Sequence, residues 1–266
     1  MGQHTGLPLQ ILSDILARYG PYFLYIYTVV LGLGVVLALG VTAVLARREE
    51  TPAWLDGALL AAMGALLLGR VIFVWLNAEY FAENPAEAWQ LQLGGLNYHG
   101  ALLGGLAALW LWARLTGRSF YRYAGLFAPG LALLAAFGWA ACAAEGCAYG
   151  RIADPGDWAA ASLLTTDLPD NLGVFAVRYR TQVAGFAGSL LVFIAALRAT
   201  DRVRPTLLFW ATLGGLSLVR VVVAFGRGDP APVVGGLRLD LLIDLGLLGV
   251  SLIAWAYLSL RKGESQ

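Results

Sequence analysis

Charged residues are scarce in this sequence. Asp, Glu, Lys and Arg make up only 13% of its 266 residues, whereas 59% are hydrophobic, and a soluble domain carries about 25% charged residues. A chain with about half that charge has too few polar groups to cover its surface in water. The composition therefore excludes an ordinary soluble domain and predicts an integral membrane protein.

Lysine and cysteine are also rare, and the net charge is only +1, which gives no electrostatic attraction for nucleic acid. The only lysine, Lys262, lies near the C-terminus and cannot be the buried Schiff-base lysine of a retinal photoreceptor. Cys142 and Cys147 cannot form a disulfide framework and lack CxxC spacing, so we interpret them as small packing residues. No cluster of His, Cys and carboxylate residues has metal-ligand spacing, so no metal or cofactor is predicted.

Long apolar runs, by contrast, are abundant. A membrane-spanning helix needs about 20 mostly apolar residues, and we expect an all-α membrane protein with about seven spans, at 21–46, 57–77, 98–113, 123–144, 181–197, 206–225 and 239–260. Residues 1–20 carry apolar residues at helical spacing and lack a removable signal, which predicts a short interfacial helix. Without repeats or linkers, residues 1–266 form a single membrane domain.

Basic residues predict the orientation. They gather in alternate connections between the spans, where the sequence has Arg47, Arg48, Arg114, Arg118, Arg122, Arg198, Arg202, Arg204, Arg261 and Lys262. By the positive-inside rule the N-terminus lies outside and the C-terminus in the cytoplasm. The polar region 145–180 and the start of the third span then face outward.

Four ionisable residues lie inside or at the edges of the predicted spans: Arg70, His99, Arg220 and Arg227. Each charge at the centre of a bilayer costs about 2.5–3.5 kcal/mol, so such residues usually face a cavity and a partner. Imidazole accepts a proton near neutral pH, which makes His99 a candidate general base. The alternative is a structural histidine bonded to a backbone carbonyl.

Arg220 and Arg227 are seven residues apart, which is two helical turns and places them on one helix face. Two guanidinium groups without an acid between them suit a bound phosphate. The alternative is that Arg220 extends to the interface and Arg227 belongs to a turn. Gly100 and Gly104 form a GxxxG pair, whose simplest explanation is helix packing.

Several motifs, in this order and spacing, resemble the bacterial prolipoprotein diacylglyceryl transferase family over about residues 20–260. YHGALLGG at 98–105 resembles its HGGLLGG signature. Other matches are Gly20-Pro21 with Tyr27, Gly69-Arg70, Asn84-Pro85 with Gly94-Gly95, Thr181-Gln182, and Arg220 with the RGD sequence at 227–229.

The resemblance implies transfer of a diacylglyceryl group from phosphatidylglycerol to a lipobox cysteine of a prolipoprotein, with release of glycerol phosphate. It implies seven spans and a bacterial plasma membrane location, and the orientation predicted from the basic residues then places the site on the periplasmic or outer side. His99 and Arg220 would be catalytic, and the substrate-binding residues would be Tyr27, Arg70, Gly100, Gly104, Gly150 and Arg227. The partners would be phosphatidylglycerol, prolipoprotein signal peptides and other membrane lipids.

Four positions depart from the family pattern. In the fourth span an arginine of that pattern is Trp139, an asparagine is Cys142 and a glutamate is Cys147, and the acid expected between the two arginines of the sixth span is Ala224. A second hypothesis is therefore a family member without catalysis that binds lipid or serves in a larger membrane complex. The two hypotheses differ in whether Arg70, His99, Arg220 and Arg227 converge on one cavity or Trp139 fills it.

Overall fold

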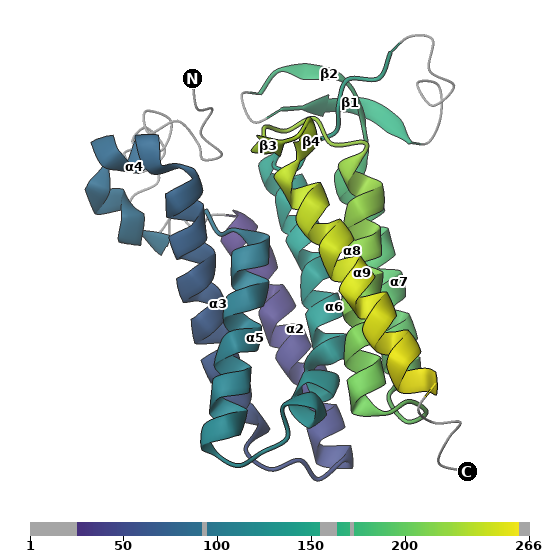
Figure 1. Ribbon diagram of the computed structural model, residues 1–266. Helices are drawn as coiled ribbons and strands as arrows, with labels where there is room; N and C mark the ends of the chain where they lie inside the picture. The colour runs from purple at the N-terminus through teal and green to yellow at the C-terminus, as the bar shows by residue number, and fades with distance from the viewer. Residues whose placement is uncertain (1–25, 92–94, 155–163, 171–172, 261–266) are drawn as a thin grey trace.

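The computed structural model describes residues 26–91, 95–154, 164–170 and 173–260. Seven long helices form a bundle (Figure 1): α2 (Ile26–Arg48), α3 (Trp54–Leu76), α5 (Tyr98–Leu115), α6 (Phe120–Glu145), α7 (Thr181–Ala199), α8 (Pro205–Ala224) and α9 (Leu239–Leu260). They coincide with the seven predicted spans to within a few residues, because the apolar runs are long and Gly, Pro or charged residues end them.

Six of these helices are long and apolar enough to cross a membrane. The seventh, α5, has 18 residues, begins with Tyr98 and His99 and is not among these six. The chain is thus a multi-pass membrane protein, and the span formed by α5 stays a prediction.

The two ends of the bundle differ. At one end, short connections join α2 to α3, α5 to α6 and α7 to α8. At the other end lie α4 (Ala78–Glu83), the 3₁₀ helix η1 (Pro85–Trp89) and two antiparallel hairpins, β1–β2 (Thr165–Pro169, Phe175–Tyr179) and β3–β4 (Val233–Val234, Leu237–Arg238). The polar region 145–180 therefore contains the β1–β2 hairpin, and the shorter β3–β4 hairpin lies between α8 and α9. The predicted interfacial helix at 1–20 lies outside the described residues.

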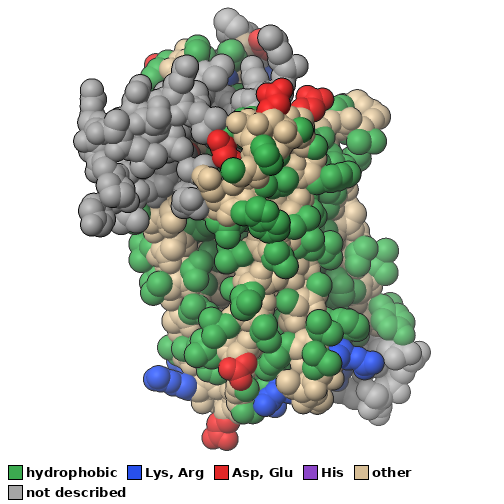
Figure 2. Space-filling model, turned by 90° about the vertical axis from the view of Figure 1, so that its left-hand side faces the viewer, with side chains coloured by type: hydrophobic (Ala, Val, Ile, Leu, Met, Phe, Trp, Pro, Cys, Tyr) green, Lys and Arg blue, Asp and Glu red, His purple; other side chains and the backbone are tan. Residues whose placement is uncertain are grey.

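The surface has the pattern of a membrane protein. Figure 2 shows a wide belt of hydrophobic side chains, with arginine at the end of the short connections. Large apolar side chains such as Val36, Leu67, Leu191 and Ile253 are more than half exposed. Such a belt suits lipid contact and is rare on soluble monomers.

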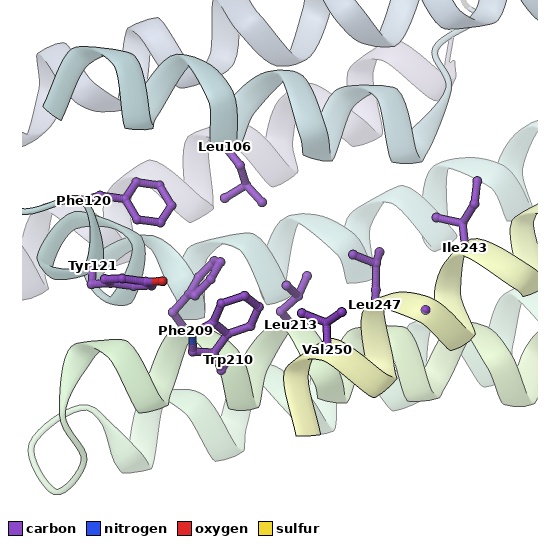
Figure 3. Close-up of a pocket in the computed structure, with 10 residues that line it drawn as sticks. Leu106, Phe120, Tyr121, Phe209, Trp210, Leu213, Ile243, Leu247 and Val250 are labelled. Atoms are coloured by element: carbon purple, nitrogen blue, oxygen red, sulfur yellow. The ribbon is translucent and has the colours of Figure 1, made fainter. Parts of the chain in front are cut away.

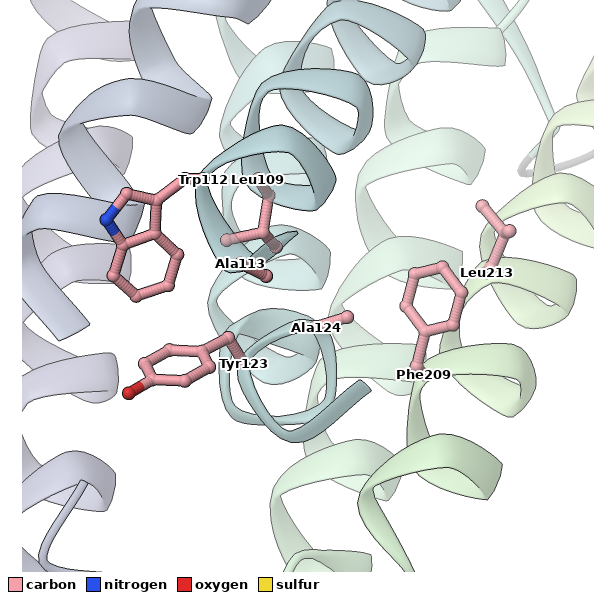
Figure 4. Packing of buried hydrophobic residues seen from close by; sticks show 7 residues of the cluster. All are labelled: Leu109, Trp112, Ala113, Tyr123, Ala124, Phe209 and Leu213. Carbon is pink, nitrogen blue, oxygen red and sulfur yellow. The ribbon is translucent and has the colours of Figure 1, made fainter. Parts of the chain in front are cut away.

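The tightest apolar core lies near the end with the short connections. It joins α5, α6 and α8 through Leu109, Trp112, Ala113, Tyr123, Ala124, Phe209 and Leu213 (Figure 4). Trp112 and Tyr123 meet edge to face at 4.8 Å between ring centroids, a favoured aromatic geometry, and the Tyr123 hydroxyl donates to the Pro52 carbonyl. The interior of the bundle near this end is therefore apolar.

Helices α3 and α5 approach each other closely through glycine. A Cβ added at Gly104 would lie 2.2 Å from the Gly64 carbonyl oxygen, and one at Gly100 would lie 2.9 Å from the Leu68 carbonyl oxygen. Small residues allow such backbone approach between membrane helices. Helix packing therefore accounts for the GxxxG pair, and a role of Gly100 and Gly104 in substrate binding stays a prediction.

Candidate functional site

Three helices bring His99, Arg220 and Asp244 together at the end of the bundle that carries the hairpins. The His99 Nε2 atom lies 3.0 Å from Asp244 Oδ1, and Arg220 Nε donates to Asp244 Oδ1 at 3.1 Å and Oδ2 at 2.9 Å. Asp244 is only 2% exposed. One buried carboxylate thus joins the two residues predicted to be catalytic.

Sequence reasoning missed Asp244. The signal was present, because a carboxylate inside an apolar span is expensive and is usually paired. Its partners lie on α5 and α8, 145 and 24 residues away, and no local spacing links such distant positions. The site was therefore predicted as cations and an imidazole, without the acid that neutralises Arg220.

Aromatic rings surround the Arg220 guanidinium. Its Cζ atom lies 3.8 Å from the centroid of the Tyr98 ring and 6.0 Å from that of Trp139, within reach of cation–π attraction. The Nε atom is bonded to Asp244, and among the described residues neither terminal nitrogen makes a hydrogen bond. The two terminal nitrogens, which form the outer edge of the guanidinium, therefore have N–H donors available for a ligand.

Arg70 is not part of this cluster. It is 4% exposed and donates to the carbonyl oxygens of Glu87 (2.6 Å), Ala88 (2.8 Å) and Gly95 (3.0 Å). A guanidinium that binds these carbonyls holds η1 close to Gly95, shortly before α5. Gly95 has φ +82° and lies against the ring of Phe73, a conformation and contact that favour glycine.

Asn97, just before α5, fixes the position at which the helix that carries His99 begins. The Asn97 amide donates to the Gly69 carbonyl at 3.0 Å, and the Asn97 side chain accepts from the Gly100 amide at 2.8 Å. Asparagine is a favoured N-cap residue because its side chain satisfies a free helical amide. Arg70, Gly69 and Asn97 thus position His99 indirectly.

The prediction that Arg220 and Arg227 share a helix face is wrong, because α8 ends at Ala224. Arg227 lies beyond the helix and bonds two carboxylates, Asp229 at 2.5 and 2.8 Å and Asp240 at 2.8 Å. Arg238 bonds the same two acids. Burial lowers the pKa of Arg227, but its hydrogen bond and charge interaction with Asp229, together with the charge of Asp240, give a net rise.

Gly150 lies where three segments cross. It forms a β-bridge with Arg227, and a Cβ added to it would lie 2.1 Å from the Tyr179 carbonyl oxygen. This close backbone contact accounts for the glycine.

Tyr27, in the first turn of α2, lies within electrostatic reach of Glu145, and no hydrogen bond among the described residues connects it to His99, Arg220 or Asp244. Substrate contacts of Gly150 and Tyr27 stay predictions.

An apolar groove of about 460 Å³ runs along the bundle between α5 and α9 (Figure 3). Aromatic rings of Phe120, Tyr121, Phe209 and Trp210 line one end, and Leu106 and Val250 face each other across it. At the other end lies Ile243, the residue before Asp244. The groove has the apolar lining that an acyl chain requires.

Comparison with known proteins relates the chain to one family. A family model described as prolipoprotein diacylglyceryl transferase matches residues 14–257. The chain belongs to this family. Relatives named phosphatidylglycerol–prolipoprotein diacylglyceryl transferase occur in Bacillus anthracis and Bacillus cereus, each 29% identical over 91% of this chain and 90% of the relative. Another from Bacillus cereus is 33% identical over 48% of both chains.

Trp139 departs from the pattern expected of a diacylglyceryl transferase, but it does not separate the site residues. Its ring packs on Gly185 of α7, where an added Cβ would lie 2.3 Å from it, and it clusters with Ala148 and Val223. His99 and Arg220 still meet on Asp244. Convergence is therefore found for these two residues, whereas Arg70 and Arg227 have separate carbonyl and carboxylate partners.

The other departures of this family member also have structural partners. Cys142 and Cys147 form a disulfide at the end of α6, so their interpretation as simple packing residues is wrong. The disulfide closes the turn at Gly146, next to Gln182, whose amide donates to the Cys147 carbonyl at 3.0 Å. Ala224 is buried with Val221 and Leu241, and α9 supplies the carboxylate that pairs with Arg220.

Proposed function

We propose that this protein transfers a diacylglyceryl group from phosphatidylglycerol to the lipobox cysteine of a prolipoprotein and releases glycerol phosphate. The observation that carries the proposal is the pairing of His99 and Arg220 on one buried carboxylate. It places a proton acceptor and a phosphate-binding cation side by side, in a chain of the corresponding family.

The reaction needs both groups. A thiol becomes nucleophilic when it loses its proton, and His99 can accept that proton. The sulfur then bonds to the terminal glycerol carbon of the diacylglyceryl group, and the bond between that carbon and the phosphate oxygen breaks. The departing phosphate keeps the electron pair, and the outer edge of Arg220 stabilises its charge in a dry site.

The substrates also fit the surroundings. The apolar groove beside α9 extends to Ile243, the residue before Asp244 in the sequence, and its lining suits an acyl chain of phosphatidylglycerol. A prolipoprotein presents its thiol next to a membrane-embedded signal peptide, so both substrates reach the site from the bilayer. The positive-inside rule supports a site on the periplasmic side of the bacterial plasma membrane. No observation favours the non-catalytic alternative or a larger complex.

Purified protein with phosphatidylglycerol and a synthetic lipobox peptide tests the proposal. The expected result is a mass gain of one diacylglyceryl group on the peptide, and a fall of at least about 100-fold in rate in His99→Gln, because a positioned general base contributes about 10²–10⁴-fold. Val234→Ala, in an exposed hairpin of the same end, is the control and should keep full activity. An unmodified peptide, beside an active relative in the same assay, would contradict the proposal.

A further inference from the structure

We infer that Asp244 is a positioning residue that fixes His99 in the tautomer protonated at Nε2 and leaves Nδ1 as the atom that accepts the thiol proton. The inference rests on the proposed function and adds to it the atom that acts as base. It starts from the 3.0 Å contact between His99 Nε2 and Asp244 Oδ1.

The charge state of Asp244 decides the direction of that hydrogen bond. Arg220 Nε donates to both carboxylate oxygens, which stabilises the ionised form of the acid. An ionised carboxylate only accepts hydrogen bonds, so the proton in the contact with His99 belongs to Nε2. In neutral imidazole the other nitrogen, Nδ1, then carries the lone pair.

The lone pair of Nδ1 has no competing donor in the part of the chain that the structure describes. Among the described residues, the contact with Asp244 is the only hydrogen bond of His99, and the neighbouring Tyr98 meets its ring edge to face at 5.2 Å between centroids. The side chain of His99 is 11% exposed, so the ring is neither fully buried nor open to solvent. A partly buried ring with a free Nδ1 lone pair is what we expect of a general base that accepts a proton from a bound substrate.

Burial keeps the arrangement fixed. Asp244 is 3% exposed at its side chain, and a buried carboxylate without partners is costly, so it stays on Arg220 and His99. The hydrogen bonds of Asp244 with His99 and Arg220 also join α5 to α8 and α9 at the hairpin end of the bundle. Asp244 thus holds the imidazole of α5 next to α8 and α9.

Nitrogen-15 NMR of histidine-labelled protein tests the inference in the full chain. The sequence has two histidines, His4 and His99, so His4→Gln leaves one imidazole. The wild-type site should show an unprotonated Nδ1 and a protonated Nε2, and Asp244→Asn should populate the other tautomer and lose about 100-fold in kcat. Ser251→Ala is the matched control, because Ser251 is equally buried on α9 and its hydroxyl has no hydrogen-bond partner in the described structure.

Two results would overturn the inference. One is a wild-type spectrum with Nδ1 protonated, alone or together with Nε2, and this result needs no variant to fold. The other is a kcat of Asp244→Asn within about twofold of the Ser251→Ala control. A wild-type protein without transferase activity would instead refute the proposed function, and the spectrum would still decide whether Asp244 fixes the tautomer.

Discussion

Arg220 uses its inner edge and its outer edge for different purposes. The Nε atom binds Asp244 at 2.9 Å, which compensates both buried charges, and the terminal nitrogens remain for phosphate. Arg227 differs, because Nε and both terminal nitrogens bind carboxylates. We therefore expect Arg220 to act on the leaving phosphate and Arg227 to hold the loop that follows α8.

The variant Arg220→Lys separates the pairing with Asp244 from the binding of the leaving phosphate. Lysine can keep a charge pair with Asp244 but has no second planar edge for the phosphate. The rate should fall by about 10²–10³-fold, as expected when one donor to a developing anion is lost, while the unfolding temperature changes little. Arg202→Lys, at the exposed opposite end, is the control for arginine replacement. A fully active Arg220→Lys would show that the outer edge does not bind the leaving group.

Single residues of the site were predictable only in part. His99 and Arg220 were predicted because an ionisable group in an apolar span indicates function; the structure brings both to Asp244, and their catalytic roles stay predictions. Arg70 and Arg227 carry the same signal but bind backbone carbonyls and carboxylates, which composition cannot distinguish from a ligand site. Asp244 was missed because its partners are brought to it only by the packing of three helices.

At the scale of elements, the α3–α5 contact determines where His99 lies. Gly104→Ala should lower the free energy of unfolding by about 1–3 kcal/mol, the usual cost of overpacking, because the new Cβ would meet the Gly64 backbone. Gly40→Ala in α2 is the matched control, since nothing lies within 4 Å of its added Cβ. Thermal unfolding in detergent measures both. An unchanged stability with a raised KM for phosphatidylglycerol would favour substrate contact at Gly104.

The disulfide at the end of α6 supports the turn beside Gln182 and Ala148. In the chain-entropy account a bridge across so few residues contributes about 2 kcal/mol, so Cys142→Ser with Cys147→Ser should unfold at a temperature several degrees lower. Alkylation before and after reduction, followed by intact mass, checks the bond itself. Two alkyl groups taken up without reductant would contradict it.

The bounds of the helices were predictable because each depends on a long local run of apolar residues. The span predicted at 239–260 is the helix Leu239–Leu260. The β1–β2 hairpin was not predicted, since its strand Thr165–Pro169 is short and polar and pairs with Phe175–Tyr179 only in the folded region above the bundle. The local sequence pattern was thus sufficient to predict the helices of the bundle, whereas the β1–β2 hairpin depends on tertiary contacts.

At the scale of the whole molecule, the arginines of the short connections and the candidate site lie at opposite ends of the bundle. This arrangement predicts that the site faces outward. In a background without the native cysteines, Val234→Cys in the β3–β4 hairpin should react with a membrane-impermeant maleimide in intact cells. Arg202→Cys, at the basic end, should react only after the membrane is opened. The reverse labelling would contradict the predicted orientation.

The stoichiometry of transfer tests the central proposal most directly. Phosphatidylglycerol and lipobox peptide are incubated with the protein, glycerol phosphate is followed by phosphorus NMR, and the modified peptide by mass. We expect one glycerol phosphate for each diacylglyceryl group on the peptide, and neither product when serine replaces the peptide cysteine. Glycerol phosphate released without modified peptide, or no product beside an active relative, would contradict the account.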